Sequence, residues 1–195
     1  MPLSPAIRAT GDLGDLAGLG ALLVVGLGLS GVSALRYLAR TGAQIMAAGF
    51  VHGVLNSDNI NVTGESFDYG PWRFLPRFDP GFTAAYFDTG GLYSFARQPE
   101  AVFWNLTQLA GCLKLVAEVE PLTDALNGFG PAYIRELRAA FLMRLGVHSL
   151  GEAADQRLVD ATLALLREGG EAMRFGIAVG RAGTGFAGSG TISGA

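Results

Sequence analysis

The sequence has little of what several common chemistries require: it contains one cysteine, two histidines and one lysine among 195 residues, and only 16% of its residues are charged. A single cysteine cannot form an internal disulfide, and one cysteine with two histidines cannot supply the four ligands of a structural zinc site. The net charge is −3, so the chain lacks the basic excess typical of nucleic-acid-binding proteins. We therefore expect no disulfide, no structural zinc, no nucleic-acid partner and a reducing compartment, the cytoplasm.

Glycine, by contrast, is abundant and unevenly distributed. Of the 29 glycines, seven lie in residues 1–31, 14 in 32–169 and eight in 170–195. Half of the residues are apolar, which excludes a disordered, charge-rich chain and is enough for a hydrophobic core. We expect a folded body at 39–169, a glycine-rich apolar segment at 1–38 and a glycine-rich flexible tail at 170–195.

Residues 16–35 carry no charge, and as a helix they would be long enough to cross a bilayer. Alternatively, a strand at 21–25, a G-x-G-x-x-G turn at 26–31 and a helix beginning at Val32 would form a phosphate-binding loop. The eighteen residues that begin with this turn resemble the nucleotide loop of the muramoyl-alanine ligases. Three interpretations therefore stay open: contact with a membrane, binding of a nucleotide, and a purely structural segment.

A candidate metal site follows this stretch. Apolar and polar residues alternate over 60–67, which predicts a β-hairpin with a two-residue turn at 63–64. That turn places Asn59 opposite Asp68, with Asp58 one residue before the pair. An amide oxygen and a carboxylate are hard ligands of the kind that Mg²⁺ uses beside the phosphates of a nucleotide. The alternative is that these polar residues only form turns.

The same three side chains match parts of a protein kinase. In kinases an Asn of the catalytic loop and the Asp of an Asp-Phe-Gly turn hold the metal ions, near an Asp that accepts the proton of the substrate hydroxyl. The sequence Asp-Tyr-Gly at 68–70 has the form of that turn. Together with His-Gly-Val-Leu-Asn-Ser-Asp-Asn at 52–59, it resembles the selenoprotein O (SelO, YdiU) family, kinase-like proteins that transfer AMP from ATP to protein hydroxyl groups.

The resemblance extends over about residues 39–168 and implies both a fold and a site. The implied fold is a kinase-like C-lobe, mainly α-helical with a small β-hairpin (α+β), whose N-lobe is missing. The implied site uses Asp58 as proton acceptor, with Asn59 and Asp68 as ligands of Mg²⁺ or Mn²⁺. The implied substrates are ATP and the Ser, Thr or Tyr hydroxyls of proteins, in a cytoplasm of bacterial type.

The sequence also departs from the family. Family members are much longer, and their N-lobe supplies basic residues that hold the nucleotide. Here only Arg8 and Arg36 precede residue 39, the one lysine is Lys114, and the family's C-terminal cysteine or selenocysteine motif is absent. We therefore expect weak or no activity and no redox regulation of that kind. Two alternatives stay open. The first is a non-enzymatic kinase-like remnant or membrane-associated binding protein, and the second is a protein that binds nucleotides through its glycine loop.

Three helices are predicted after the site, from Pro99 to Val116, from Pro131 to Leu145, and from Glu152 to the glycines at 169–170. Ser149 and Glu152 have the spacing of a capping box. The residues expected to face the core are Val102, Leu106, Leu109, Cys112, Leu113 and Val116 in the first helix, Ile134, Leu137, Phe141 and Leu145 in the second, and Leu158, Ala161 and Leu165 in the third. The residues expected to face solvent are Arg135, Arg138 and Arg144.

Two further groups of residues lie near the site. His52 either orients Asp58 through a hydrogen bond or has a purely structural role, and we favour the structural role. Eight aromatic residues follow in a stretch rich in loops, and we expect them to anchor it to the core rather than to stack on a base. They are Trp72, Phe74, Phe78, Phe82, Tyr86, Phe87, Tyr93 and Phe95.

Overall fold

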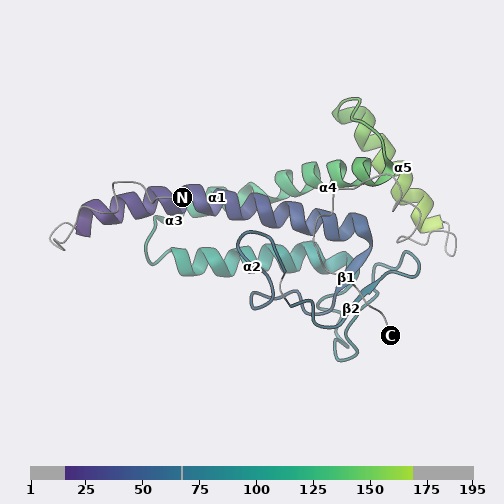
Figure 1. Ribbon diagram of the computed structural model, residues 1–195, viewed down its shortest axis with the longest axis horizontal. Coiled ribbons are helices and arrows are strands. Elements are labelled where there is room, and N and C mark those ends of the chain that lie inside the picture. Colours follow the sequence, from purple (N-terminus) through teal and green to yellow (C-terminus); the bar gives the residue numbers. More distant parts are fainter. Residues whose placement is uncertain (1–15, 67, 169–195) are drawn as a thin grey trace, which may run out of the picture.

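The computed structural model describes residues 16–66 and 68–168. These residues form helix α1 (Leu16–Ala48), strands β1 (Phe50–His52) and β2 (Trp72–Phe74), the short 3₁₀ helix η2 (Phe95–Arg97), and helices α2 (Gln98–Leu113), α3 (Val119–Asn127), α4 (Phe129–Leu145) and α5 (Glu152–Glu168) (Figure 1). The described part is mainly helical with one small antiparallel sheet, which confirms the fold class at this level. The tail predicted at 170–195 lies outside the described residues.

Helix α1 is continuous over 33 residues. Of the three interpretations left open for this stretch, the one with a strand at 21–25 and a phosphate-binding loop at 26–31 is therefore wrong. An additional strand would need a partner, whereas β1 and β2 already pair with each other, and a helix satisfies its backbone groups internally. In the part of the chain that the structure describes, no helix combines the length and the apolar character needed to cross a membrane. Helix α1 also runs through residue 38, and the division into domains at that point stays a prediction.

The main core lies where α1, α2 and α4 meet, and Figure 1 shows these three helices running lengthwise beside one another. The loop after β1 contributes two of its apolar side chains. The buried members are Leu35, Leu38, Ala39, Leu55, Ile60, Val102, Leu106, Phe129 and Ala132. Because the loop shares this core, the helices determine where the loop lies.

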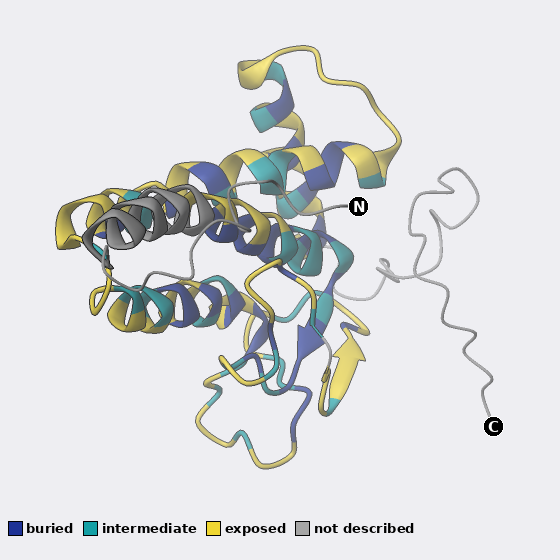
Figure 2. Ribbon diagram, turned by 60° about the vertical axis from the view of Figure 1, so that its left-hand side comes forward, coloured by how far each residue is buried: buried dark blue, intermediate teal, exposed yellow. Residues whose placement is uncertain are grey.

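Strands β1 and β2 form a short ribbon in which His52 lies opposite Trp72. Figure 2 shows β1 buried and β2 exposed beside it. Gly53 follows β1, and a Cβ atom there would lie 2.2 Å from the carbonyl oxygen of Pro71. The backbone N–H of Gly53 donates to that same oxygen at 2.8 Å, which only a residue without a side chain allows. The ribbon thus closes the loop of residues 53–71 at its base.

Helices α2, α4 and α5 form where they were predicted, but part of each predicted core face is wrong. Val102, Leu106 and Phe141 are buried as expected. The residues predicted to be buried but found exposed are Cys112, Val116, Ile134, Leu145, Leu158, Ala161 and Leu165. In α5 the buried residues fall one position later than predicted, because this helix carries leucine on two faces and packs only a narrow stripe against the rest.

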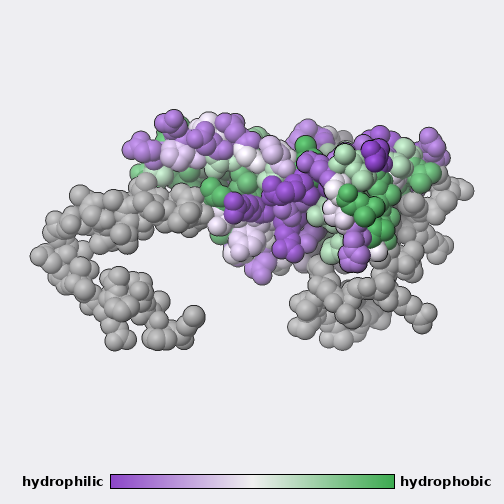
Figure 3. All heavy atoms as spheres, turned by 90° about the horizontal axis from the view of Figure 1, so that it is seen from above, coloured by the Kyte–Doolittle hydropathy of each residue, from purple (hydrophilic) through white to green (hydrophobic). Residues whose placement is uncertain are grey.

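The cap of α5 also differs from the prediction. Ser149 bonds the carboxylate of Asp155, whereas Glu152 pairs with Arg138 at 2.9 Å, so the capping box predicted between Ser149 and Glu152 does not form. Arg138, predicted to face solvent, has a side chain only 13% exposed. Several apolar side chains of α5 and of the residues before it are exposed. Figure 3 shows hydrophobic surface gathered over the end of the molecule that α5 occupies.

Candidate functional site

The loop of residues 53–71 carries the predicted site, and its base is held from both sides. One side is the ribbon with β2. On the other side Gln98, the first residue of α2, accepts the backbone N–H of His52 at 2.9 Å and donates to the carbonyl oxygen of Phe50 at 2.9 Å. Gln98 is fully buried. Its amide therefore takes the place of a third strand along β1.

The loop is also fixed along its length. Leu55 and Ile60 insert into the core cluster. Asn105 of α2 donates to the carbonyl oxygen of Leu55 at 3.2 Å, while the amide oxygen of Asn105 is buried without a hydrogen-bond partner. Thr41 of α1 donates to the carbonyl oxygen of Gly64 at 2.7 Å. The loop is thus attached to both α1 and α2 rather than projecting freely.

The structure holds Asn59 and Asp68 in defined orientations. The amide nitrogen of Asn59 donates to the carbonyl oxygen of Val54 at 2.8 Å, and this bond leaves the amide oxygen as the atom available to a ligand. One carboxylate oxygen of Asp68 accepts the N–H of Gly70 at 2.8 Å, as in an Asx turn. Asp68 is exposed and Asn59 is half-buried, so both can be reached from solvent.

A serine links the backbone at these two residues. The hydroxyl oxygen of Ser66 lies 2.8 Å from the carbonyl oxygen of Asn59 and 3.4 Å from that of Asp68. The same hydroxyl lies 3.1 Å from Nε2 of His52, whose Nδ1 accepts the N–H of Val54 at 3.2 Å. His52 therefore contacts Ser66, and its described hydrogen bonds do not include one to Asp58, the alternative that the sequence did not favour.

His52 is enclosed, and its surroundings favour the neutral ring. Burial lowers the pKa of His52, while a hydrogen bond with the backbone of Asp68 and the carboxylate of Asp68 act in the opposite direction. The side chain is fully buried, as expected for a residue whose role is structural.

The hairpin predicted over 60–67 forms only in part. Ile60 and Ser66 make a single antiparallel bridge, so the turn between them is one residue longer than predicted. Gly64 adopts a φ of +84°, a left-handed conformation that permits this longer turn. The pairing is consequently shifted by one residue, and Asn59 does not face Asp68 across a ladder. The hydroxyl of Ser66, rather than strand pairing, brings their backbones together.

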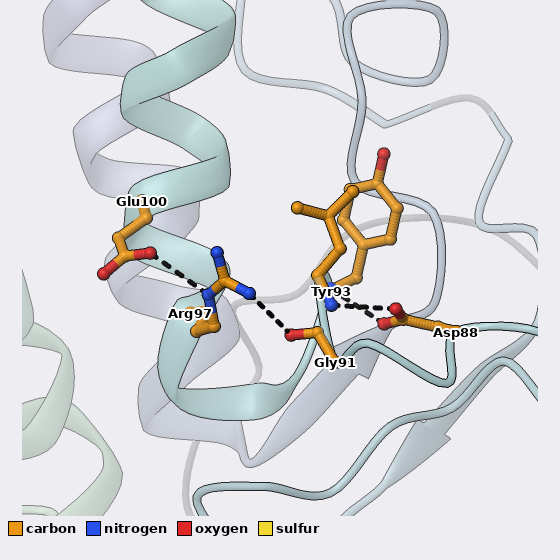
Figure 4. A network of polar contacts seen from close by, with 6 residues as sticks. Asp88, Gly91, Tyr93, Arg97 and Glu100 are labelled. Atoms are coloured by element: carbon orange, nitrogen blue, oxygen red, sulfur yellow. Dashed lines mark hydrogen bonds and ion pairs between the residues drawn. The ribbon is translucent and has the colours of Figure 1, made fainter.

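Asp58 is exposed on the same loop, near a second, tightly bonded turn. Burial, and then the charges of Asp88 and Asp58, raise the pKa of Tyr93. The carboxylate of Asp88 accepts the N–H of Tyr93 at 2.8 Å, and Arg97 donates to the carbonyl oxygen of Gly91 at 3.3 Å (Figure 4). The turn that flanks Asp58 is thus held by its own hydrogen bonds.

The donor set at this site is small. Across residues 16–66 and 68–168, no group of three or more His, Cys, Asp or Glu side chains gathers in a way that could hold a metal ion. What the loop offers is the amide oxygen of Asn59 and the carboxylate of Asp68. Mg²⁺ commonly takes one or two protein oxygens and keeps several of its waters. In chemistry and accessibility this pair fits such an ion.

The eight aromatic residues near the site divide into two groups. Phe78, Phe82 and Phe95 pack in the cluster around Val51, and Tyr93 packs against the main core, as predicted. The other four were expected to pack against the core but are exposed: Trp72, Phe74, Tyr86 and Phe87. The rings of Trp72 and Phe74 lie 5.9 Å apart on β2, and the ring of Phe50 packs against both.

Sequence reasoning missed three residues that build this site: Ser66, Gln98 and Asn105. Each is a polar side chain whose partner lies elsewhere in the fold, so no periodicity marks it. The Gln-Pro step at the start of α2 marks a helix N-terminus but gives no sign that the glutamine reaches back to β1.

Comparison with known proteins identifies the family. Residues 33–174 match the family described as protein adenylyltransferase SelO. The chain is 45% identical over 131 residues to a protein nucleotidyltransferase YdiU of Trichodesmium erythraeum, covering 67% of this chain and 28% of that relative. It is 47% identical over 125 residues to the YdiU of Gloeobacter violaceus, with 64% and 26% covered. For the YdiU of Pseudomonas putida the identity is 41% over 128 residues, with 66% and 26% covered.

The chain thus spans about a quarter of the length of these relatives. The matched residues include the loop with Asp58, Asn59 and Asp68 and most of the described helices. This match confirms the family indicated by the sequence: the chain belongs to the SelO family of protein adenylyltransferases.

Proposed function

We propose that this chain carries the catalytic-loop part of a protein adenylyltransferase with a kinase-like C-lobe. In the proposed reaction a Ser, Thr or Tyr hydroxyl of a protein attacks the α-phosphorus of ATP. The new bond joins the hydroxyl oxygen to the α-phosphorus, the bond from that phosphorus to the bridging oxygen breaks, and pyrophosphate leaves. The carboxylate of Asp58 accepts the proton of the hydroxyl.

Asn59 and Asp68 would hold a divalent cation, Mg²⁺ or Mn²⁺, at this loop. When bound, such an ion neutralises charge on the phosphates of the nucleotide and helps to orient them. The amide nitrogen of Asn59 is bonded to Val54, which leaves the amide oxygen as the atom for a ligand. The second carboxylate oxygen of Asp68 remains after the first has accepted the N–H of Gly70.

One observation carries the proposal. A single loop, closed by the ribbon and anchored in the core, brings a candidate base and two hard oxygen ligands together in a chain that belongs to the SelO family. Asp58 lies on the exposed part of this loop, where a protein hydroxyl can reach it.

The chain itself should be a weak catalyst. Transfer from ATP usually relies on cationic groups that grip the triphosphate. The one lysine, Lys114, is exposed at the end of α2. We therefore expect nucleotide binding to be easier to detect than turnover.

The test is incubation of the chain with ATP labelled on the α-phosphate and Mg²⁺, with and without a protein acceptor. We expect label to enter protein in the parent chain, and the label to be lost in Asp68→Ala and Asp58→Asn. Asp160→Asn is the matched control, because Asp160 is exposed on α5 and bonds only Gln156 among the described contacts. Equal labelling by Asp68→Ala and the parent would refute the assignment.

A further inference from the structure

We propose that Ser66 is a positioning residue: its hydroxyl, held by His52, fixes the spacing between the two metal ligands Asn59 and Asp68. The inference rests on the proposed function, because it assumes that Asn59 and Asp68 bind a divalent cation. It assigns to Ser66 a role that its sequence position alone does not suggest.

The hydrogen bonds at Ser66 have a defined direction. Nδ1 of His52 accepts the backbone N–H of Val54, so in the neutral ring the proton lies on Nε2. That N–H then donates to the hydroxyl oxygen of Ser66 at 3.1 Å. Ser66 is left with one proton to give, and the carbonyl oxygen of Asn59, at 2.8 Å, is its nearest acceptor. The chain of donors therefore runs one way, from His52 through Ser66 to Asn59.

These bonds connect the segments that carry the two ligands. Since the one hydroxyl proton of Ser66 goes to Asn59, this bond ties Asn59 to the segment that carries Asp68. The carbonyl oxygen of Asp68, two residues after Ser66, lies 3.4 Å from the same hydroxyl oxygen. The strand pairing next to it is a single bridge between Ile60 and Ser66. Beyond this bridge the turn is closed by the N–H of Asn61, which donates to the carbonyl oxygen of Glu65 at 2.7 Å. On the other side of the bridge, where Asn59 and Asp68 lie, the hydroxyl of Ser66 supplies the link.

His52, which donates to Ser66, is itself held against α2. His52 is fully buried, and its own backbone N–H is bonded to Gln98 of α2. The imidazole is thus fixed with respect to α2, while Asn59 and Asp68 lie on the accessible side of the loop. Groups that orient metal ligands from behind typically change metal affinity by about 10- to 100-fold when they are removed.

The test compares Ser66→Thr with Ser66→Val, two variants of the same shape that differ in the hydroxyl group. Binding of Mn²⁺ is measured by the electron paramagnetic resonance signal of the free ion, at a temperature where circular dichroism shows both variants folded. We expect Ser66→Thr to bind Mn²⁺ like the parent and Ser66→Val to bind it at least tenfold more weakly. The control is Ser57→Ala, an exposed serine on the same loop, which should bind like the parent.

The outcomes separate the two claims. If Asp68→Ala loses Mn²⁺ binding but Ser66→Val binds like the parent, the positioning role is refuted and the metal site stands. If the parent itself does not bind Mn²⁺, or if Asp68→Ala binds it as well as the parent, the metal site is refuted and the role of Ser66 with it. A loss of affinity in Ser66→Val, restored in Ser66→Thr, supports the positioning role.

Discussion

Replacing Gln98 by methionine tests how the site is held to the helices. The substitution keeps the volume of the side chain and removes both of its hydrogen bonds to β1. Residues 49 and 53 direct backbone groups toward β2, so those of Phe50 and His52 point the other way, toward Gln98. Without the amide, the N–H of His52 and the carbonyl of Phe50 have no acceptor or donor on that side.

The expected cost follows from burial. Gln98 and His52 are both fully buried, so water cannot replace the lost partners. A buried backbone group left without a partner costs about 1–3 kcal/mol, which gives roughly 2–6 kcal/mol for the pair. With a urea dependence of about 2 kcal/mol per molar, the middle of the usual range, the unfolding midpoint should fall by about 1–3 M.

The assay is urea unfolding followed by circular dichroism, with amide hydrogen exchange as a local measure. Exchange at the N–H of His52 should accelerate more than exchange at Gly53, whose bond to Pro71 is unchanged. Gln108→Met is the matched control, since Gln108 is exposed on the same helix. If Gln98→Met lowers the free energy of unfolding by no more than the control does, Gln98 does not hold β1 and the reasoning fails.

Two further predictions concern the base of the loop and the cap of α5. In thermal unfolding, Gly53→Ala should destabilise the fold by more than about 2 kcal/mol, because the new Cβ would lie 2.2 Å from a carbonyl oxygen. The control Gly111→Ala, whose Cβ would have nothing within 4 Å, should be neutral or stabilising by up to about 1 kcal/mol. Bonds from Ser149 and from the N–H of Leu150 lower the pKa of Asp155. This stabilisation is present at neutral pH and is lost as the pH falls below about 4, so Ser149→Ala should destabilise at pH 7 and much less at pH 3. A difference in unfolding midpoint that does not change with pH would contradict this account of the cap.

Helices α2, α4 and α5 could be predicted because proline, glycine and apolar spacing mark them, whereas the short α3 was not predicted. The buried side of each helix was harder to predict. In α5, for example, Leu158 and Leu165 have the same helical spacing as the buried Val159 and Leu166. Which stripe is buried depends on the angle at which α5 meets α4, and spacing alone does not contain that angle. For the first half of α1 the sequence left a helix and a strand with a turn both open, because a glycine-rich apolar run fits either, and the structure forms the helix.

The site was predicted through its chemistry rather than through its geometry. Asp58, Asn59 and Asp68 were identified from residue type and family resemblance, and the structure places them on one anchored loop. The predicted hairpin register was wrong by one residue, because the left-handed Gly64 allows a longer turn. The link through Ser66 could not be predicted, since it depends on a buried histidine from the neighbouring strand.

The central claim is that Asn59 and Asp68 hold a divalent cation beside the phosphates of ATP. Isothermal titration of ATP into the parent chain and into Asp68→Ala, each with and without Mg²⁺, tests it most directly. The account predicts that ATP binds the parent measurably only when Mg²⁺ is present, and that Asp68→Ala loses this Mg²⁺-dependent binding. ATP binding that depends neither on Mg²⁺ nor on Asp68 would contradict the account.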